Sequence, residues 1–343
     1  MQYSKLGNTD LTISELGFGC IPIIRLDVEQ AVNVLQHAYD RGITFYDTAN
    51  MYRDSEEKIG KAFAGKRDKI VIATKTLSRD AETVTRHIEN SLRMLKTDYI
   101  DLFQFHQVAH EHEFDAITAP DGALEAVARA RAAGKIRHVG FSSHSLAMAL
   151  KLVKTGMFAT VQFPFNFIED EPKHELFPEA VQRGMGIIAM KPFAGGVIDN
   201  ADIVFKFLRQ FPEVTPIPGF DSVEYVDQVV SFYQQPNRII ETDRETMENY
   251  RVTLGKKFCR RCEYCQPCPE GVMITTAMGY NVIASRMSPK VSIEFCKVVM
   301  ESVLNCIECG ECVERCPYEL PIPDMLKEHY DLYEKHRNGV EKQ

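Results

Sequence analysis

The sequence lacks the features of a membrane protein and of a nucleic-acid-binding protein. No window approaches the roughly eighteen consecutive apolar residues that a membrane-crossing helix needs, and the chain does not begin with a basic segment followed by an apolar run. Its 48 acidic side chains outnumber its 40 basic ones, and the resulting net charge of −8 repels nucleic acid and anionic lipid. We therefore expect a cytoplasmic protein that binds neither nucleic acid nor membrane.

A dinucleotide-binding fingerprint is also missing. No G-x-G-x-x-G motif opens a strand–helix unit, and the sequence GFG at Gly17 to Gly19 is by itself a weak signal. A Rossmann dehydrogenase is therefore disfavoured.

The first two thirds of the chain instead alternate short β-rich runs with amphipathic helical segments. Between the first two runs, for example, Ala31, Val34, Leu35 and Ala38 recur at helical spacing. The eight runs are Leu16–Cys20, Thr44–Ala49, Ile70–Lys75, Ile100–His106, Ile136–Ser143, Thr160–Asn166, Gly186–Pro192 and Val214–Phe220. Eight such units over about 230 residues predict an α/β fold of the (β/α)8 TIM-barrel type, closed at the bottom by a hairpin at Gly7-Asn8.

The alternation stops at Gln235-Pro236-Asn237, where turn-forming residues interrupt the pattern. We expect the barrel to comprise residues 1–235. Residues 236–343 should form a connecting helix and a small, mostly α-helical domain that holds the cysteines.

Polar side chains follow three successive barrel strands. Asp47 ends the second strand with Tyr52 five residues later, Lys75 ends the third and His106 ends the fourth. Catalytic groups of TIM barrels lie at the carboxyl ends of the strands, so these four side chains can converge. Each one alone could be a strand-end ion pair or cap, but four together favour a catalytic set.

The four residues suit the reduction of a carbonyl group by hydride transfer, which leaves negative charge on oxygen. Tyr52 is the expected proton donor, and the Lys75 ammonium is expected to lower its pKa from about 10. Asp47 would pair with Lys75, and a neutral His106 would donate a hydrogen bond to the carbonyl oxygen.

Before residue 259 the chain contains a single cysteine, Cys20, and from there on cysteines are frequent. Nine of the ten cysteines lie between Cys259 and Cys316, which in a chain without an export signal favours metal ligation over disulfides. Two ladders, each ending in Cys-Pro, contain Cys259, Cys262, Cys265 and Cys268, then Cys306, Cys309, Cys312 and Cys316.

Such ladders are typical of two [4Fe–4S] clusters, with the last cysteine of each ladder serving the other cluster. We expect Cys316 to join the first three cysteines of the first ladder, and Cys268 to join those of the second. The first ladder has two residues before its Cys-Pro instead of three, so four local ligands remain an alternative. Zinc also binds C-x2-C pairs but normally joins two separated pairs. Cys296 is expected to be a buried free thiol.

The motif DTANMYRDSEEKIGKAF, together with Lys75 and His106, resembles the aldo-keto reductase family, whose Asp, Tyr, Lys and His tetrad matches Asp47, Tyr52, Lys75 and His106. Residues 255–322 resemble the dicluster ferredoxin domain that extends one branch of that family. The resemblance implies an NAD(P)H cofactor across the barrel mouth, with Phe165 stacked on the nicotinamide ring. The implied contacts are Gly19, Asp47, Ser142, Ser143, Gln162, Phe165, Lys191, Pro192, Phe193, Gly195, Gly219, Asp221 and Ser222.

Several positions depart from the family pattern. Ser143 and Phe165 stand where many members have Asn and Tyr, and Gln107 stands where many have Trp, a residue that this chain lacks altogether. Substrate preference therefore cannot be inferred from the family. The segment GFDSVEY offers Asp221 and Glu224 but no cation for a 2′-phosphate, which favours NADH over NADPH.

Two main functions follow from these observations, and ferredoxin-coupled reduction of a substrate is a third possibility. The first is an oxidoreductase that interconverts an aldehyde or ketone and an alcohol, with clusters that transfer electrons or stabilise the fold. The alternative is an electron-transfer protein whose barrel binds nucleotide without reducing carbonyls. A ferredoxin-like or flavodoxin-like carrier is the expected partner, and Lys256, Lys257, Arg260 and Arg261 either dock an acidic carrier or offset the charge of the cluster thiolates.

Overall fold

The computed structural model describes residues 1–254, 257–284 and 289–340. The chain consists of two compact units, Met1–Asp243 and Arg244–Gln343. Within the described residues, no helix is both long and apolar enough to cross a membrane.

The first unit is a parallel barrel. Its eight strands pair in the order β10-β9-β8-β7-β6-β5-β4-β3, and a parallel bridge between Gly19 and Gly219 joins the two ends of the sheet. The strands are β3 (Phe18–Gly19), β4 (Phe45–Asp47), β5 (Val71–Thr76), β6 (Ile100–Phe105), β7 (Ile136–Ser142), β8 (Thr160–Pro164), β9 (Gly186–Met190) and β10 (Val214–Pro216). The TIM barrel predicted from the alternation is confirmed.

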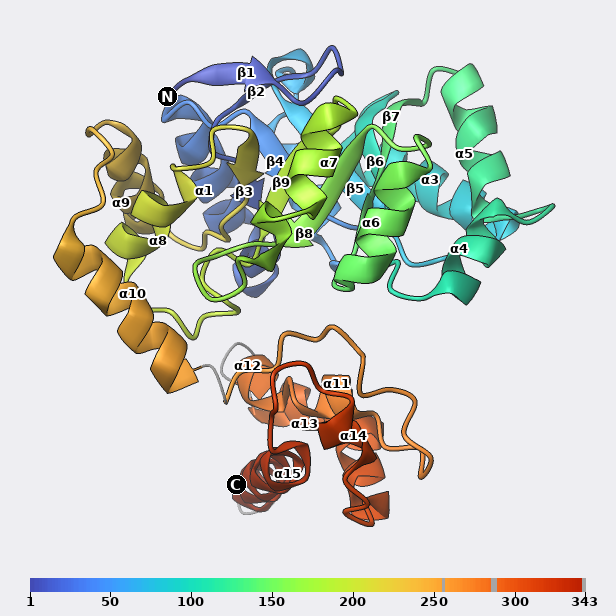
Figure 1. The fold of residues 1–343 in the computed structure, drawn as a ribbon. Helices are drawn as coiled ribbons and strands as arrows, with labels where there is room; N and C mark the ends of the chain where they lie inside the picture. The colour runs from blue at the N-terminus through green and yellow to red at the C-terminus, as the bar shows by residue number, and fades with distance from the viewer. Residues whose placement is uncertain (255–256, 285–288, 341–343) are drawn as a thin grey trace. The chain divides into compact units, whose positions relative to one another are not determined.

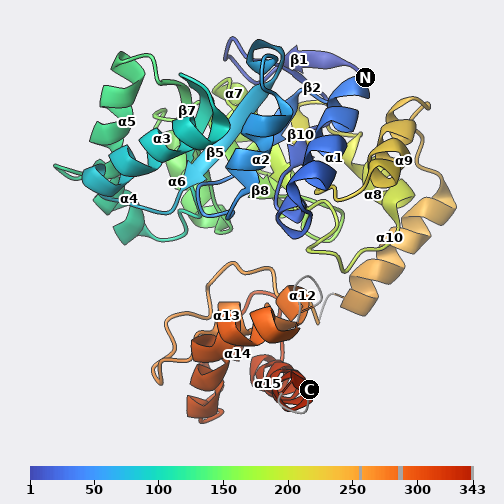
Figure 2. The ribbon, with the colours of Figure 1, turned by 180° about the vertical axis from the view of Figure 1, so that it is seen from behind.

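Helices surround the strands. Figure 1 shows α6 and α7 in front of the sheet, and Figure 2, from behind, shows α2 and α3 in front. After the short helix η1 (Pro22–Arg25), the helices are α1 (Val28–Asp40), α2 (Ser55–Ala62), α3 (Ala81–Leu95), α4 (Glu111–Thr118), α5 (Ala123–Ala132), α6 (Leu146–Lys154), α7 (Leu176–Gln182), α8 (Ala201–Leu208) and α9 (Val223–Tyr233).

Helix α3 illustrates why these segments are helical. Asp80 caps its first turn by accepting a hydrogen bond from the backbone N–H of Thr83 at 2.7 Å. Its buried residues Val84, Ile88 and Leu92 recur every four positions and form a single stripe. The opposite face stays in water, so the helix packs on the barrel through one side.

An apolar cluster fills the bottom of the barrel. The hairpin strands β1 (Tyr3–Lys5) and β2 (Thr12–Ser14) lie across that end (Figure 1). The cluster joins residues of the hairpin segment to inward-facing strand residues, namely Leu6, Leu11, Ile13, Phe45, Val71, Ala73, Leu102, Ile188 and Ile217. Polar side chains inside the barrel are therefore confined to layers nearer the carboxyl ends of the strands.

The second unit is mostly helical and has its own core. Helix α10 (Glu241–Leu254) begins in the first unit and continues into the second. The other helices of the second unit are α11 (Ile274–Ala277), α12 (Tyr280–Ala284), α13 (Pro289–Ser302), α14 (Glu311–Glu314) and α15 (Ile322–Val340), with the short η4 (Val303–Asn305). The rings of Tyr280 and Tyr333 pack edge to face, with their centroids 5.5 Å apart. Cysteines Cys265, Cys296, Cys312 and Cys316 belong to the same buried cluster. The core of this unit is therefore built partly from thiols.

Candidate active site and metal centre

A buried ion pair lies where two neighbouring barrel strands end. Asp47 ends β4, and Lys75 lies near the end of β5, its hydrogen-bonded neighbour. The Lys75 ammonium donates to Asp47 Oδ2 at 2.6 Å and to the Thr48 carbonyl oxygen at 2.7 Å. Burial raises the pKa of Asp47, and the charge and hydrogen bond of Lys75 oppose that rise. A buried ion pair often adds little to stability, so stability alone does not explain this pair. Its position at the mouth of the barrel therefore marks a candidate functional site.

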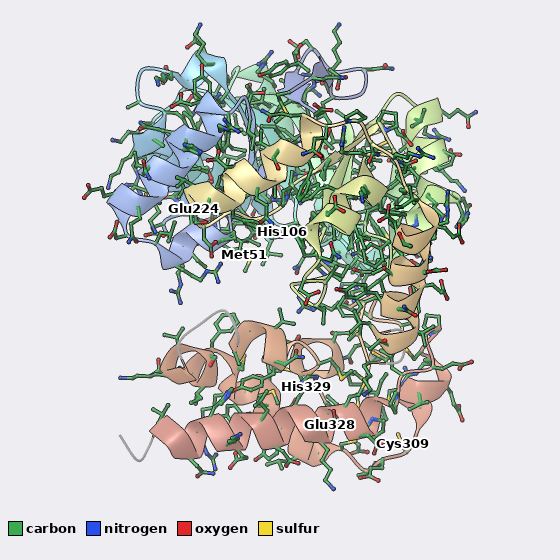
Figure 3. The ribbon with its side chains drawn as sticks, turned by 90° about the vertical axis from the view of Figure 1, so that its left-hand side faces the viewer. Met51, His106, Glu224, Cys309, Glu328 and His329 are labelled. Carbon is green, nitrogen blue, oxygen red and sulfur yellow. The ribbon has the colours of Figure 1, made fainter. Side chains whose placement is uncertain are left out.

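Tyr52 and His106 lie beside this pair. The Tyr52 ring centroid is 5.5 Å from Lys75 Nζ and 5.8 Å from the His106 ring centroid, with the two rings edge to face. Figure 3 labels His106, Tyr52's neighbour Met51, and Glu224 of α9 toward the same end of the barrel. The structure thus brings the four predicted residues together.

The pKa of His106 agrees with the sequence analysis, and the pKa of Tyr52 does not. Burial and the positive charges of Lys75 and Arg79 hold the pKa of His106 well below its usual value, so that the imidazole is neutral, as predicted. The expected lowering of the Tyr52 pKa is wrong. Removal from water raises the pKa instead, and the negative charge of Asp47 raises it further.

Two predicted cofactor contacts hold the loop that follows His106. Ser142 Oγ accepts a hydrogen bond from the backbone N–H of Gln107 at 2.9 Å, and Ser143 Oγ donates to the Val108 carbonyl oxygen at 2.7 Å. Both serines are buried at the end of β7. They therefore fix the backbone beside His106.

The predicted glycine contacts lie where the backbone is closely packed. A Cβ on Gly19 would come within 2.7 Å of the Ile217 carbonyl oxygen, so a side chain has no room at this point of barrel closure. Gly219, its bridge partner, precedes Asp221 and Ser222, and Ser222 caps α9 by accepting from the backbone N–H of Tyr225 at 3.2 Å. A helix N-terminus therefore opens next to the strand ends.

The segment after β9 turns tightly. Lys191 and Gly195 have positive φ angles of 56° and 79°, and the backbone N–H of Gly196 donates to the Phe193 carbonyl oxygen at 2.7 Å. Pro192 between them is buried. Such successive turns can direct backbone N–H groups at a phosphate.

The predicted stacking role of Phe165 is wrong. The ring is fully buried, with its centroid 4.8 Å from that of Phe177, 5.3 Å from Phe207 and 4.9 Å from Phe211. Because Phe165 lies beyond the end of β8 and turns into this aromatic core, it offers no face to a ligand.

The argument for NADH also fails, because it considered only the residues near Asp221 in sequence. Arg25, at the end of η1, places its Nη2 atom 2.7 Å from Asp221 Oδ2. Both side chains are well exposed. A guanidinium therefore does lie at the segment predicted to meet the adenosine end.

Two residues at the mouth escaped the sequence analysis. Gln104 is fully buried on β6, and its Nε2 atom donates to Gln162 Oε1 at 2.9 Å. Met190 ends β9 and packs, half-buried, against the apolar cluster inside the barrel. Alternation along each strand was the available signal, because Gln104 lies two residues before His106, and Met190 two residues after buried Ile188.

The second cysteine ladder forms one side of a cavity. Cys306, Cys309 and Cys312 line it together with Cys268 of the first ladder. Four cysteines from two distant segments thus line one cavity, and their number and type suit a cluster with four thiolate ligands. Cys309 is exposed and is labelled in Figure 3.

The first ladder groups with the last cysteine of the second. Burial raises the pKa of Cys262 to about 11 and that of Cys265 to about 12, with further contributions from the negative charges of Cys259 and Cys316. Thiols with such pKa values bind as thiolates when a metal displaces their protons. Cys259 and Cys316 therefore lie close enough to Cys262 and Cys265 for their charges to be felt.

The basic residues near the first ladder are partly engaged inside the unit. The Arg260 guanidinium stacks 3.7 Å from the centroid of the Tyr318 ring, and Arg261 lies against Gly279. Lys256 lies outside the described residues. These two arginines thus contact other residues of the second unit, while Lys257 is exposed.

A closed parallel barrel with a buried Asp–Lys pair, a tyrosine and a neutral histidine at its mouth defines a barrel oxidoreductase with a cysteine-rich extension. The chain belongs to the aldo/keto reductase family, whose model matches residues 15–205, and residues 258–320 match the 4Fe-4S dicluster domain.

Relatives agree with this assignment, and solved structures agree with the fold. The chain is 30% identical to the uncharacterized oxidoreductase YrpG of Bacillus subtilis, over 79% of this chain and 98% of the relative, and 33% identical to the aldo-keto reductase YhdN of the same organism, over 52% and 58%. The holo form of aldo-keto reductase AKR11C1 from Bacillus halodurans matches with a TM-score of 0.63 at 23% identity, over 73% of this chain and 96% of that one. An aldo-keto reductase from Klebsiella pneumoniae in complex with NADPH matches with a TM-score of 0.60 at 23% identity, over 73% and 95%.

Proposed function

We propose that the barrel reduces an aldehyde or ketone to an alcohol, or catalyses the reverse reaction, with a nicotinamide dinucleotide as the hydride carrier. The observation that carries the proposal is the buried Asp47–Lys75 pair with Tyr52 and His106 beside it. The thiolate-rich second unit suits a reducing compartment, which agrees with a cytoplasmic location.

Each of the four side chains has a distinct part in this reaction. The reduced nicotinamide, when bound, supplies a hydride to the carbonyl carbon. Tyr52 donates its hydroxyl proton to the carbonyl oxygen, and neutral His106 donates a ring N–H to the same oxygen. Asp47 holds the Lys75 ammonium beside the phenol, where its positive charge stabilises the phenolate that remains. A phenol with a raised pKa can still protonate an alkoxide, which is a stronger base.

Residues around the mouth suit the ring of the cofactor. Gln162 is buried on β8 with its amide in the same layer as Asp47. Met190 provides a half-buried apolar side chain in the next layer toward the mouth. It pairs in register with Pro164, which lies two residues after Gln162 on β8. We propose that Gln162 binds the carboxamide and Met190 contacts the face of the ring.

Arg25 makes NADPH an acceptable cofactor. Its guanidinium can form a charge-assisted hydrogen bond with a 2′-phosphate, and Asp221 holds it in place when no phosphate is bound. We expect Arg25→Ala to weaken NADPH binding by about tenfold and to leave NADH binding nearly unchanged. Fluorescence titration of each nucleotide measures this.

Arg41 provides the matched control for Arg25. Like Arg25, it pairs with an aspartate, since its Nε atom lies 2.9 Å from Oδ1 of Asp227 in α9. However, Arg41 follows the carboxyl end of α1, away from the segment predicted to meet the adenosine end. Arg41→Ala should change neither affinity. Equal losses for both nucleotides in Arg25→Ala would contradict a contact with the 2′-phosphate.

We propose that the second unit holds two [4Fe–4S] clusters with crossed ligands. Cys259, Cys262, Cys265 and Cys316 would hold one, and Cys306, Cys309, Cys312 and Cys268 the other. The shared cavity and the grouping of the thiols support this pairing. Each cluster passes one electron at a time, whereas a hydride carries two, so the clusters either exchange electrons with a separate carrier or stabilise the unit.

The test of the function is a steady-state assay on anaerobically purified full-length protein. NADPH or NADH oxidation should depend on added aldehyde or ketone across a panel of small substrates. Turnover with no member of the panel would overturn carbonyl reduction. Turnover supported by reduced ferredoxin without nicotinamide would instead indicate a ferredoxin-coupled reduction of the substrate.

A further inference from the structure

We infer that Gln104 is a positioning residue that orients the Gln162 amide and the Asp47 carboxylate toward the nicotinamide end of the cofactor. The inference rests on the proposed function and deepens it, because it names a residue outside the predicted site that determines how the cofactor ring is held.

Gln104 connects two predicted site residues that lie on strands on either side of β6. It lies on β6 two positions before His106, which directly follows the strand, so alternation directs both side chains to the same side. Its Nε2 atom donates to Gln162 Oε1 at 2.9 Å and lies 3.3 Å from Asp47 Oδ1. Gln162 Nε2 in turn lies 3.4 Å from Asp47 Oδ2. The two amides and the carboxylate therefore form a closed triangle.

The donors and acceptors of this triangle can be arranged in one way only. An ionised carboxylate accepts hydrogen bonds but donates none, so both amides must turn their NH2 groups toward Asp47. Gln104 can then reach Gln162 only through the Gln162 oxygen. With its oxygen engaged, Gln162 has its remaining amide hydrogen to offer, which suits the oxygen of a carboxamide.

Packing alone does not account for a glutamine at this position. Gln104 is fully buried, and its Oε1 atom has no hydrogen-bond partner among the residues that the structure describes. A buried polar atom without a partner costs free energy, and an apolar side chain of similar length would avoid that cost. The two hydrogen bonds that Gln104 donates therefore explain why an amide side chain lies at this position.

The test compares two ligands that differ in the nicotinamide. We would measure binding of NADP+ and of 2′-phospho-ADP-ribose, which lacks the ring, to full-length Gln104→Met by calorimetry. NADP+ affinity should fall by about tenfold, the effect of losing roughly one hydrogen bond, while affinity for the ringless ligand stays the same. NAD+ and ADP-ribose serve as the equivalent pair.

Two further variants keep the test decisive. Gln104→Asn withdraws the amide by one methylene, should fold if Gln104→Met does not, and should show the same selective loss. Thr160→Val is the control, because Thr160 is a fully buried polar residue two positions before Gln162 and its Oγ1 also has no partner in the described chain. It should bind both ligands like the wild type.

The outcomes separate this inference from the proposed function. Equal weakening of both ligands, or no weakening of either, in a folded Gln104 variant would overturn the positioning role. Wild-type protein that binds neither NADP+ nor NAD+ would overturn the proposed function, and the inference would fall with it.

Discussion

Replacing Tyr52 with phenylalanine is expected to lower kcat for carbonyl reduction by about a thousandfold, within the range that a positioned general acid contributes. The substitution removes the proton donor and leaves the ring that lies against His106 and Lys75. Steady-state oxidation of NADPH or NADH with an aldehyde substrate measures the loss. Cofactor affinity should change little, because the hydroxyl acts on the substrate oxygen.

Tyr99 offers a matched control for this substitution. It is also half-buried but lies before β6, near the opposite ends of the strands, where Arg67 stacks on its ring. Tyr99→Phe should retain wild-type turnover. If Tyr52→Phe turned over at the wild-type rate, the assignment of the acid would be wrong.

The same site predicts an unusual pH dependence. The raised pKa of Tyr52 keeps the phenol protonated well into alkaline solution, and the lowered pKa of His106 keeps the imidazole neutral in mildly acidic solution. Neither group should therefore impose a limb on the rate of reduction between about pH 6 and 9. This holds for the free enzyme and is measured as kcat/KM against pH.

Loss of a cluster ligand is expected to have the second largest effect, on the second unit. Cys309→Ala should reduce the iron content from about eight atoms per chain to about four. The buried core of this unit includes Cys265, Cys312 and Cys316, so an empty site leaves thiols and a cavity in place of a bonded centre. Because metal binding supplies much of the folding free energy of small metal-containing domains, proteolysis within residues 244–343 should become faster.

A double variant tests the crossed ligation. If Cys268 and Cys309 bind the same cluster, Cys268→Ala combined with Cys309→Ala should lose no more iron than either single variant. If the first ladder used four local ligands, the double variant would lose both clusters and almost all of its iron. Cys296→Ala is the control, since Cys296 is buried in the same core but lies outside both ladders. It should keep the full iron content.

Carbonyl reduction should survive the loss of one cluster if the clusters only stabilise the second unit or serve a separate carrier. The barrel residues of the proposed reaction all lie within Met1–Asp243. We therefore expect Cys309→Ala to retain turnover with NADPH or NADH. Loss of that turnover would show that electrons pass through the clusters during the reaction.

Local pattern determined much of what the sequence predicted correctly. Strand and helix periodicities depend on neighbouring residues, and eight repeats of strand and helix leave few folds that can bury both faces of a parallel sheet. Asp47, Lys75 and His106 could be placed at one mouth because all parallel strands of a barrel end on the same side. The cysteine ladders could also be recognised from the sequence, since three of the expected ligands of each cluster lie within one short loop.

The tertiary structure decided the contacts between residues far apart in sequence and the electrostatics that follow from them. Arg25 meets Asp221 across 196 positions, and Gln104 meets Gln162 across 58, distances over which no local pattern exists. Phe165 turns into an aromatic core that later segments supply. The pKa of Tyr52 rises where a lone lysine would have lowered it, because burial and the paired aspartate outweigh that charge, and burial is a property of the folded chain.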